Sequence, residues 1–123
     1  HVHNAVGCAI VQSDSDVGIQ RLDQEADKAW ADGRKVGIDM AMEEAWTWLS
    51  LNPAKSLGID DKTGTLQPGK MADLVLWSAD PFSVYAKPDQ VYIDGALMYD
   101  RSDEAARPLM DFEIGQPGEG DMK

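Results

Sequence analysis

The sequence has one cysteine, two histidines and no long apolar run, and these shortages exclude several classes of protein. Because Cys8 has no partner in the chain, an intrachain disulfide is impossible, and its neighbours Gly7, Ala9 and Ile10 favour a small buried side chain over a nucleophile. No apolar stretch approaches the roughly 18 residues of a membrane span, and no charged segment precedes an apolar one at the start. The compartment is left open between the cytoplasm and a bacterial periplasm.

Basic residues are also scarce, because 11 Lys and Arg stand against 22 Asp and Glu and leave a formal charge of −11. This charge repels phosphate backbones and anionic lipids, and the basic residues form no cluster, so we expect no nucleic-acid and no membrane partner. The acids predict either a solvated surface or a cationic partner. With 43% hydrophobic residues and four Trp, the 123 residues suffice for one modest domain.

The first half of the chain predicts one strand and three helices. Residues 8–12 are a partly β-branched apolar run, which predicts a buried strand, and Ser13-Asp14-Ser15-Asp16 then forms a polar loop. Helical spacing of apolar residues predicts a helix over residues 19–34 with Gly33 near its end. Asp39 can cap a second helix, and Asn52-Pro53 can cap and start a third that Gly58 closes.

The second of these helices carries an apolar stripe, which we interpret as core rather than as a ligand pocket. The stripe consists of Met42, Ala45, Trp46 and Leu49. Trp48 lies on the other side of the helix, where it indicates a surface that absent parts of the fold or another subunit would cover.

The second half of the chain is punctuated by turns and predicts short strands. Residues 74–77 predict a buried strand, and residues 90–93 and 96–99 flank Asp94-Gly95. This dipeptide favours a type I′ hairpin, because both central residues of that turn need positive φ. From residue 101 onward the chain is rich in Asp, Glu, Pro and Gly and predicts an outer tail.

Four motifs in this order and spacing form a recognisable signature. They are Asn52-Pro53-Ala54-Lys55-Ser56-Leu57-Gly58-Ile59, Gly64-Thr65-Leu66-Gln67-Pro68-Gly69-Lys70-Met71-Ala72-Asp73-Leu74-Val75-Leu76-Trp77, Asp80-Pro81 and Val91-Tyr92-Ile93-Asp94-Gly95. Residues 49–99 thereby resemble the C-terminal part of the amidohydrolase superfamily, which includes imidazolonepropionase-like and prolidase-like hydrolases. Ser13-Asp14, with the segment from Gly18 to Trp30, resembles the last barrel strand of that family and the helix after it.

The resemblance implies a fold in which a (β/α)₈ TIM barrel joins a small β-sandwich built from both chain ends. The chain would then be an α+β fragment, with the last barrel strand and its helices in residues 1–58. Residues 59–100 would form the C-terminal half of the sandwich, and residues 101–123 an acidic tail rich in Gly and Pro.

By the same resemblance, Asp14 matches the aspartate that binds the metal and moves the proton of the attacking water. The implied parent enzyme hydrolyses a C–N bond of a small-molecule amide, cyclic amide or dipeptide, with a divalent metal, zinc in the first place. A carboxylate suits both tasks, since it is an oxygen ligand and a proton acceptor, and barrel enzymes place such groups where strands end. Gln20 and Arg21 could reach substrate, although a solvated helix start is the simpler interpretation.

The most recognisable part of the signature, Lys70-Met71-Ala72-Asp73, has a structural interpretation. Pro68-Gly69 turns the chain just before it, and Asp73 leads into a predicted strand. We therefore expect no catalytic residue in this motif.

The sequence also departs from the family pattern. The family metal site needs a His-x-His pair on the first strand and two further His, whereas this chain has only the pair His1 and His3, which ends eleven residues before Asp14. We expect neither to bind a catalytic metal. A closed barrel needs about 200 residues or more, and the chain opens without Met. We expect a fragment without turnover by itself, forming a homo-oligomer or associating with a missing N-terminal part.

Two other metal motifs overlap Asp14. Asp14-Ser15-Asp16 could be the DxD of a glycosyltransferase, but three residues in so acidic a chain carry little weight. A calcium loop starting at Asp14 would reach Glu25 at its twelfth position, but it lacks the fifth-position ligand, and Ile19 replaces the glycine at the sixth.

Overall fold

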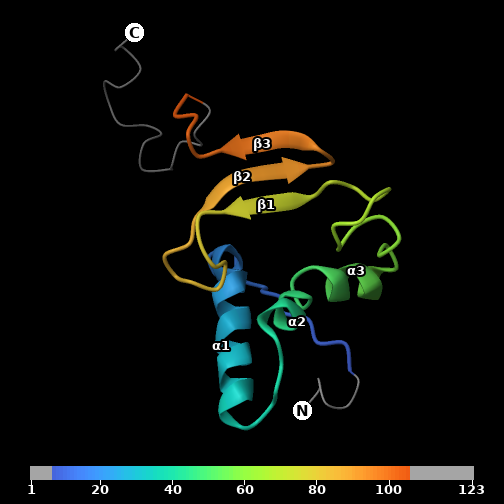
Figure 1. Ribbon diagram of the computed structural model, residues 1–123, viewed down its shortest axis with the longest axis vertical. Coiled ribbons are helices and arrows are strands. Elements are labelled where there is room, and N and C mark those ends of the chain that lie inside the picture. Colours follow the sequence, from blue (N-terminus) through green and yellow to red (C-terminus); the bar gives the residue numbers. More distant parts are fainter. Residues whose placement is uncertain (1–6, 106–123) are drawn as a thin grey trace.

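The computed structural model describes residues 7–105 of the chain, with helices in the first half and one sheet in the second (Figure 1). The elements are a 3-10 turn η2 (Gly18–Arg21), helices α1 (Leu22–Lys35), α2 (Met42–Trp46) and α3 (Leu51–Leu57), and strands β1 (Leu74–Trp77), β2 (Pro88–Ile93) and β3 (Ala96–Asp100). This confirms the α+β class. No helix of the described part is long and apolar enough to cross a membrane.

Helix α1 has the charge distribution that its backbone dipole favours. Asp23 and Glu25 lie in the first turn, and Arg34 and Lys35 lie in the last. The inward face buries Ala26 completely. The predicted helix over residues 19–34 is therefore confirmed, with Gly33 near its end as expected, although its first residues form η2.

Helix α2 begins without the predicted cap. Ala41, not Asp39, is its N-cap residue, and no side chain caps the helix. The predicted stripe is confirmed as core only in part. Ala45 is fully buried and the other three residues pack against the core cluster, but these three are half-buried and also line an open groove. The prediction for Trp48 was wrong, because this side chain is only 8% exposed and belongs to the core.

Helix α3 ends as predicted but starts one residue before Asn52. Gly58 adopts φ +68° and closes the helix, a left-handed conformation that glycine reaches without steric cost. Ser50 is the N-cap residue, so Asn52 is already helical and its side chain is not a cap.

The predicted strand over residues 8–12 is absent, and these residues have no regular secondary structure. Ala9 and Val11 pack toward the core while Ile10 is 39% exposed, so the inward and outward alternation of a strand persists. A barrel strand needs hydrogen bonds from neighbouring strands, and residues 7–105 contain no strand beside this segment. Cys8, predicted to be buried, is exposed.

The sheet has three antiparallel strands in the order β1-β2-β3. Ile93 pairs with Ala96 across the two-residue turn, where Asp94 has φ +51° and Gly95 φ +79°. The type I′ hairpin is therefore confirmed. The described residues form a single sheet without a second sheet facing it, so β1 is half open to solvent and not buried as predicted.

Aromatic side chains join the sheet to the helices. The ring of Phe82, in the loop after β1, lies 5.3 Å from Trp46 on α2 and 5.9 Å from Trp30 on α1. Trp77, at the end of β1, meets Trp46 edge-on at 6.2 Å. Phe82 is only 5% exposed, so the loop after β1 is the main apolar link between the two halves.

Candidate functional site

Asp14 lies in a tight turn between the apolar residues 8–12 and η2. The backbone N–H of Ser15 donates to Ser13 Oγ, and that of Gly18 donates to Ser15 Oγ, both at 3.0 Å. A Cβ on Gly18 would lie 3.0 Å from Ser13 Oγ, so the turn favours a glycine there. The Asp14 side chain is exposed and makes no hydrogen bond to any described residue.

The two rival motifs do not fit this turn. Asp16 Oδ1 accepts a hydrogen bond from the N–H of Val17 at 3.0 Å, which is a local backbone contact. A calcium loop starting at Asp14 would still be a loop at Gly18, but helical backbone already begins there. Glu25, which would be its last ligand, instead forms an ion pair with Lys28 on the surface of α1. Within residues 7–105, no group of three or more His, Cys, Asp or Glu side chains lies close enough to hold a metal ion.

The described residues therefore do not form a metal site by themselves, and Asp14 could contribute only one ligand. His1 and His3 lie outside the described residues. Gln20 and Arg21 are exposed in η2, and neither forms a hydrogen bond or ion pair with Asp14. Of the residues that the sequence singled out for the site, those within residues 7–105 form no hydrogen bond or ion pair with the Asp14 carboxylate.

A contact that the sequence did not predict holds the segment before Asp14. The side-chain amide of Asn52 donates to the carbonyl of Ala9 at 2.8 Å, and the N–H of Val11 donates to the carbonyl of Trp48 at 3.2 Å. Trp48 lies between α2 and α3, and Asn52 lies in the first turn of α3. The sequence signal was present in the Asn52-Pro53 pair, but it predicted a helix cap instead.

Lys70 and Asp73 have the structural role expected for their motif. Lys70 Nζ donates to Thr65 Oγ1 at 2.8 Å and to the carbonyl of Asp60. Asp73 accepts hydrogen bonds from Thr63 Oγ1 at 3.0 Å and from the N–H of Asp94 at 2.8 Å. These bonds tie the loop before β1 to the hairpin turn.

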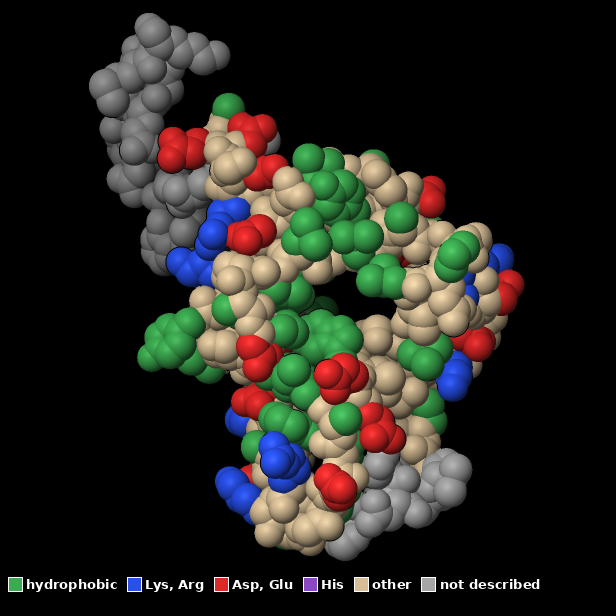
Figure 2. Space-filling model, in the orientation of Figure 1, with side chains coloured by type: hydrophobic (Ala, Val, Ile, Leu, Met, Phe, Trp, Pro, Cys, Tyr) green, Lys and Arg blue, Asp and Glu red, His purple; other side chains and the backbone are tan. Residues whose placement is uncertain are grey.

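A groove of about 930 Å³ separates the sheet from α2 and α3. Figure 2 shows the molecule hollowed at this place, with hydrophobic side chains around the opening. The apolar lining includes Met42, Trp46, Leu49, Leu51, Leu57, Leu66, Leu74, Val75, Trp77 and Tyr92, whereas its charged residues are Glu43 and Asp73. Because the lining is mostly apolar, the groove is suited to another polypeptide or to an apolar ligand.

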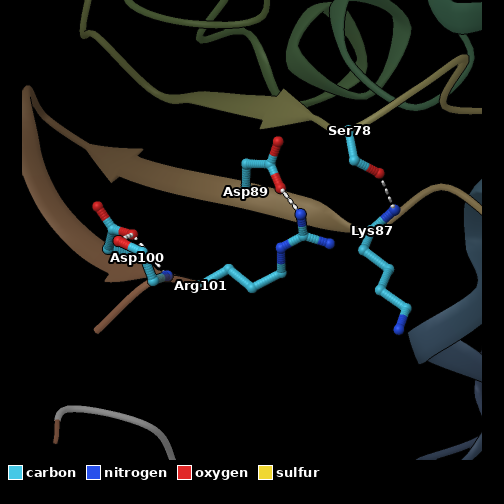
Figure 3. Close-up of polar contacts among 6 residues, drawn as sticks. Ser78, Lys87, Asp89, Asp100 and Arg101 are labelled. Carbon is cyan, nitrogen blue, oxygen red and sulfur yellow. Dashed lines mark hydrogen bonds and ion pairs between the residues drawn. The ribbon is translucent and has the colours of Figure 1, made fainter. Parts of the chain in front are cut away.

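The polar groups at the open end of the hairpin pair with one another (Figure 3). Arg101 Nη2 lies 2.8 Å from Asp89 Oδ1 and forms an ion pair with it. Hydrogen bonds from Ser102, and then from Gln90, hold the pKa of the Asp100 carboxyl below its ordinary value of 3.8. These contacts close the hairpin and do not indicate a second site.

A model of the amidohydrolase family matches residues 19–98. The chain belongs to the amidohydrolase family. The resemblance expected from the sequence is therefore confirmed. Family members are hydrolases acting on C–N bonds and are typically metal-dependent. The matched range begins after Asp14, so the family match itself does not assign a role to that residue.

Individual relatives agree with this assignment over parts of the chain. It is 42% identical over 64 residues to a urease subunit alpha of Natronomonas pharaonis (52% of this chain, 11% of the relative). It is 58% identical over 36 residues to an imidazolonepropionase of Shewanella oneidensis (29% of this chain, 9% of the relative). An amidohydrolase structure from Thermotoga maritima matches with a TM-score of 0.51 and 39% identity, covering 62% of this chain and 19% of that one.

The chain thus spans about a tenth of the length of these two relatives. Their names denote different activities, so the shared region does not separate one substrate from another.

Proposed function

We propose that this chain is the C-terminal part of a metal-dependent amidohydrolase that hydrolyses an amide or cyclic amide, and that Asp14 is its contribution to the catalytic site. The observation that carries the proposal is the match to the Thermotoga amidohydrolase at 39% identity. The match covers 62% of this chain but only 19% of that protein, so the matched region corresponds to a small part of a larger enzyme. We propose zinc as the metal, with its other ligands supplied from outside residues 7–105.

The surroundings of Asp14 support a role in chemistry. It follows an extended apolar segment, which is where a barrel enzyme carries its reactive groups. Its carboxylate is exposed and free of hydrogen bonds to the described residues, whereas Asp16 bonds to the backbone beside it. A free carboxylate can bind a cation or accept a proton from water.

The test is a chimera in which residues 7–105 replace the part of the Thermotoga amidohydrolase that contains the match to this chain. It is assayed on an amide that the unaltered Thermotoga enzyme hydrolyses. We expect Asp14→Asn to lower kcat by about 10²–10⁴-fold, the usual effect of losing a general acid or base. The matched control Asp16→Asn, two residues away, should stay within a few-fold. Equal effects of the two substitutions, or no effect of Asp14→Asn, would contradict the proposal.

A second candidate function is suggested by the open groove. A non-catalytic chain could self-associate through the apolar surface between the sheet and the helices, where the groove-lining Leu57 and Leu66 are 72% and 76% exposed. The mass of the 123-residue chain in solution, measured by sedimentation or light scattering, tests this. A dimer or larger species supports self-association, and a monomer at all concentrations contradicts it. We expect no metal-dependent turnover from the lone chain in either case.

A further inference from the structure

We propose that Asn52 is a positioning residue for Asp14. This inference rests on the proposed function of Asp14. The Asn52 side chain is partly buried and donates through Nδ2 to the carbonyl of Ala9, 43 residues away in the sequence, at 2.8 Å. Its own backbone carbonyl also accepts a weak contact from Cys8 Sγ at 3.8 Å. One residue of the family signature thus contacts the beginning of the segment that leads to Asp14.

This hydrogen bond and a second one, from the N–H of Val11, resemble the pair of bonds that a neighbouring strand would make. In extended backbone, the carbonyl of one residue and the N–H of the residue two positions later point to the same side. Ala9 offers its carbonyl to Asn52 Nδ2, and Val11 offers its N–H to the carbonyl of Trp48. Trp48, between α2 and α3, therefore supplies an acceptor and Asn52, in the first turn of α3, supplies a donor, at the spacing of a strand edge. These two bonds give the segment hydrogen-bond partners of the kind that a neighbouring strand would provide, although no strand of the described residues lies beside it.

Asp14 lies between two fixed points. Upstream, the bonds at Ala9 and Val11 end three residues before it. Downstream, the turn made by Ser15 and Gly18 leads into helical backbone. Because the Asp14 carboxylate makes no hydrogen bond to a residue in the range 7–105, the backbone on either side is what positions it within the described part of the chain. Loss of the Asn52 donor should therefore make the backbone before Asp14 more mobile and its carboxylate less precisely placed.

The first experiment measures amide hydrogen exchange in the full chain by NMR, comparing Asn52→Asp with the unaltered protein. Aspartate keeps the shape of Asn52 but has no donor, and its charge faces the Ala9 carbonyl. We expect exchange at Val11 to become at least about 10-fold faster, which corresponds to the loss of about one hydrogen bond. Amides of β2, such as that of Val91, should be unchanged. Uniform acceleration at both places, or unchanged exchange at Val11, would overturn the proposal.

Ser56→Ala is the matched control on the same helix. Ser56 is exposed and its hydroxyl bonds only to the carbonyl of Pro53 within the helix. Its removal should leave exchange at Val11 unchanged, and faster exchange there would contradict a specific role of Asn52. If Asn52→Asp does not fold, scalar coupling across the hydrogen bond between Asn52 Nδ2 and the Ala9 carbonyl carbon tests the contact in the unaltered chain. An absent coupling overturns the proposal.

A second arm separates positioning from the function of Asp14 itself. In the chimera with the Thermotoga enzyme, Asn52→Asp should lower kcat about 10-fold or more while KM changes little, since a displaced reactive group affects the chemical step. If Asp14→Asn has no effect there, the function of Asp14 fails although the exchange result stands. If Asp14→Asn abolishes activity but Asn52→Asp leaves kcat unchanged, only the positioning role fails.

Discussion

Gly64→Ala should strongly destabilise the protein, because Gly64 combines a positive φ with close packing. Its φ is +87°, and a Cβ at this position would lie 2.7 Å from Ala54 Cβ and 3.2 Å from Leu51 Cα. Both neighbours belong to α3, where Ala54 is buried, so the helix cannot give way without loss of packing. Gly69 provides a matched control, because its φ is +91° and a Cβ there would meet no atom within 4 Å.

The two substitutions share one cost and differ in another. A non-glycine residue at such a φ costs about 1–3 kcal/mol, so Gly69→Ala should lower the free energy of unfolding by that amount. Gly64→Ala adds the cost of overpacking, a further ~1–3 kcal/mol. Urea unfolding followed by the fluorescence of the four Trp measures the difference. With m near ~1–3 kcal/mol/M, the midpoint for Gly64→Ala should lie roughly 1 M below that for Gly69→Ala. Equal midpoints would refute the packing argument.

Two further outcomes follow from the core and the hairpin. Phe82→Ala should cost about 3–5 kcal/mol of stability and weaken the near-ultraviolet circular dichroism, because the ring contacts Trp30 and Trp46; a loss below about 1 kcal/mol would contradict this. Because the folded pKa of Asp100 is lowered, chiefly by Ser102, its contribution to stability is present above pH 3.8 and is lost as the pH falls through the folded value. A ¹³C titration of its carboxyl should give a pKa below 3.8, and a value at or above it would count against these hydrogen bonds.

The local elements of the fold could be predicted from the sequence where the signal is local. The bounds of β1 and the turn at Asp94-Gly95 follow from turn chemistry and short apolar runs, and Gly58 ends α3 as its backbone freedom predicts. Caps were less predictable, because Asp39 and Asn52 both have capping side chains and neither is used for that purpose. Capping is decided by where the chain packs, and a single sequence does not contain that information.

For the candidate site, the sequence predicts the kind of chemistry better than it predicts the local structure. Its proposed chemistry could be predicted from Asp14 and the family signature, but its surroundings could not. The segment before Asp14 has the composition of a buried strand, yet Cys8 is exposed and no strand of the described residues lies beside it. The bond from Asn52 to Ala9 links positions far apart in the chain, and no periodicity or turn rule reports such a contact.

The meander order of the sheet also has a consequence for the order in which the chain folds. Each strand pairs with the next in sequence, and β2 and β3 are joined by two residues, so this hairpin can close within about 1–10 μs. The segment before Asp14 instead gains its hydrogen bonds only when Asn52, 43 residues beyond Ala9, reaches it, and closing so long a loop costs more chain entropy. Among these elements, the segment that leads to Asp14 is therefore expected to become ordered after the hairpin.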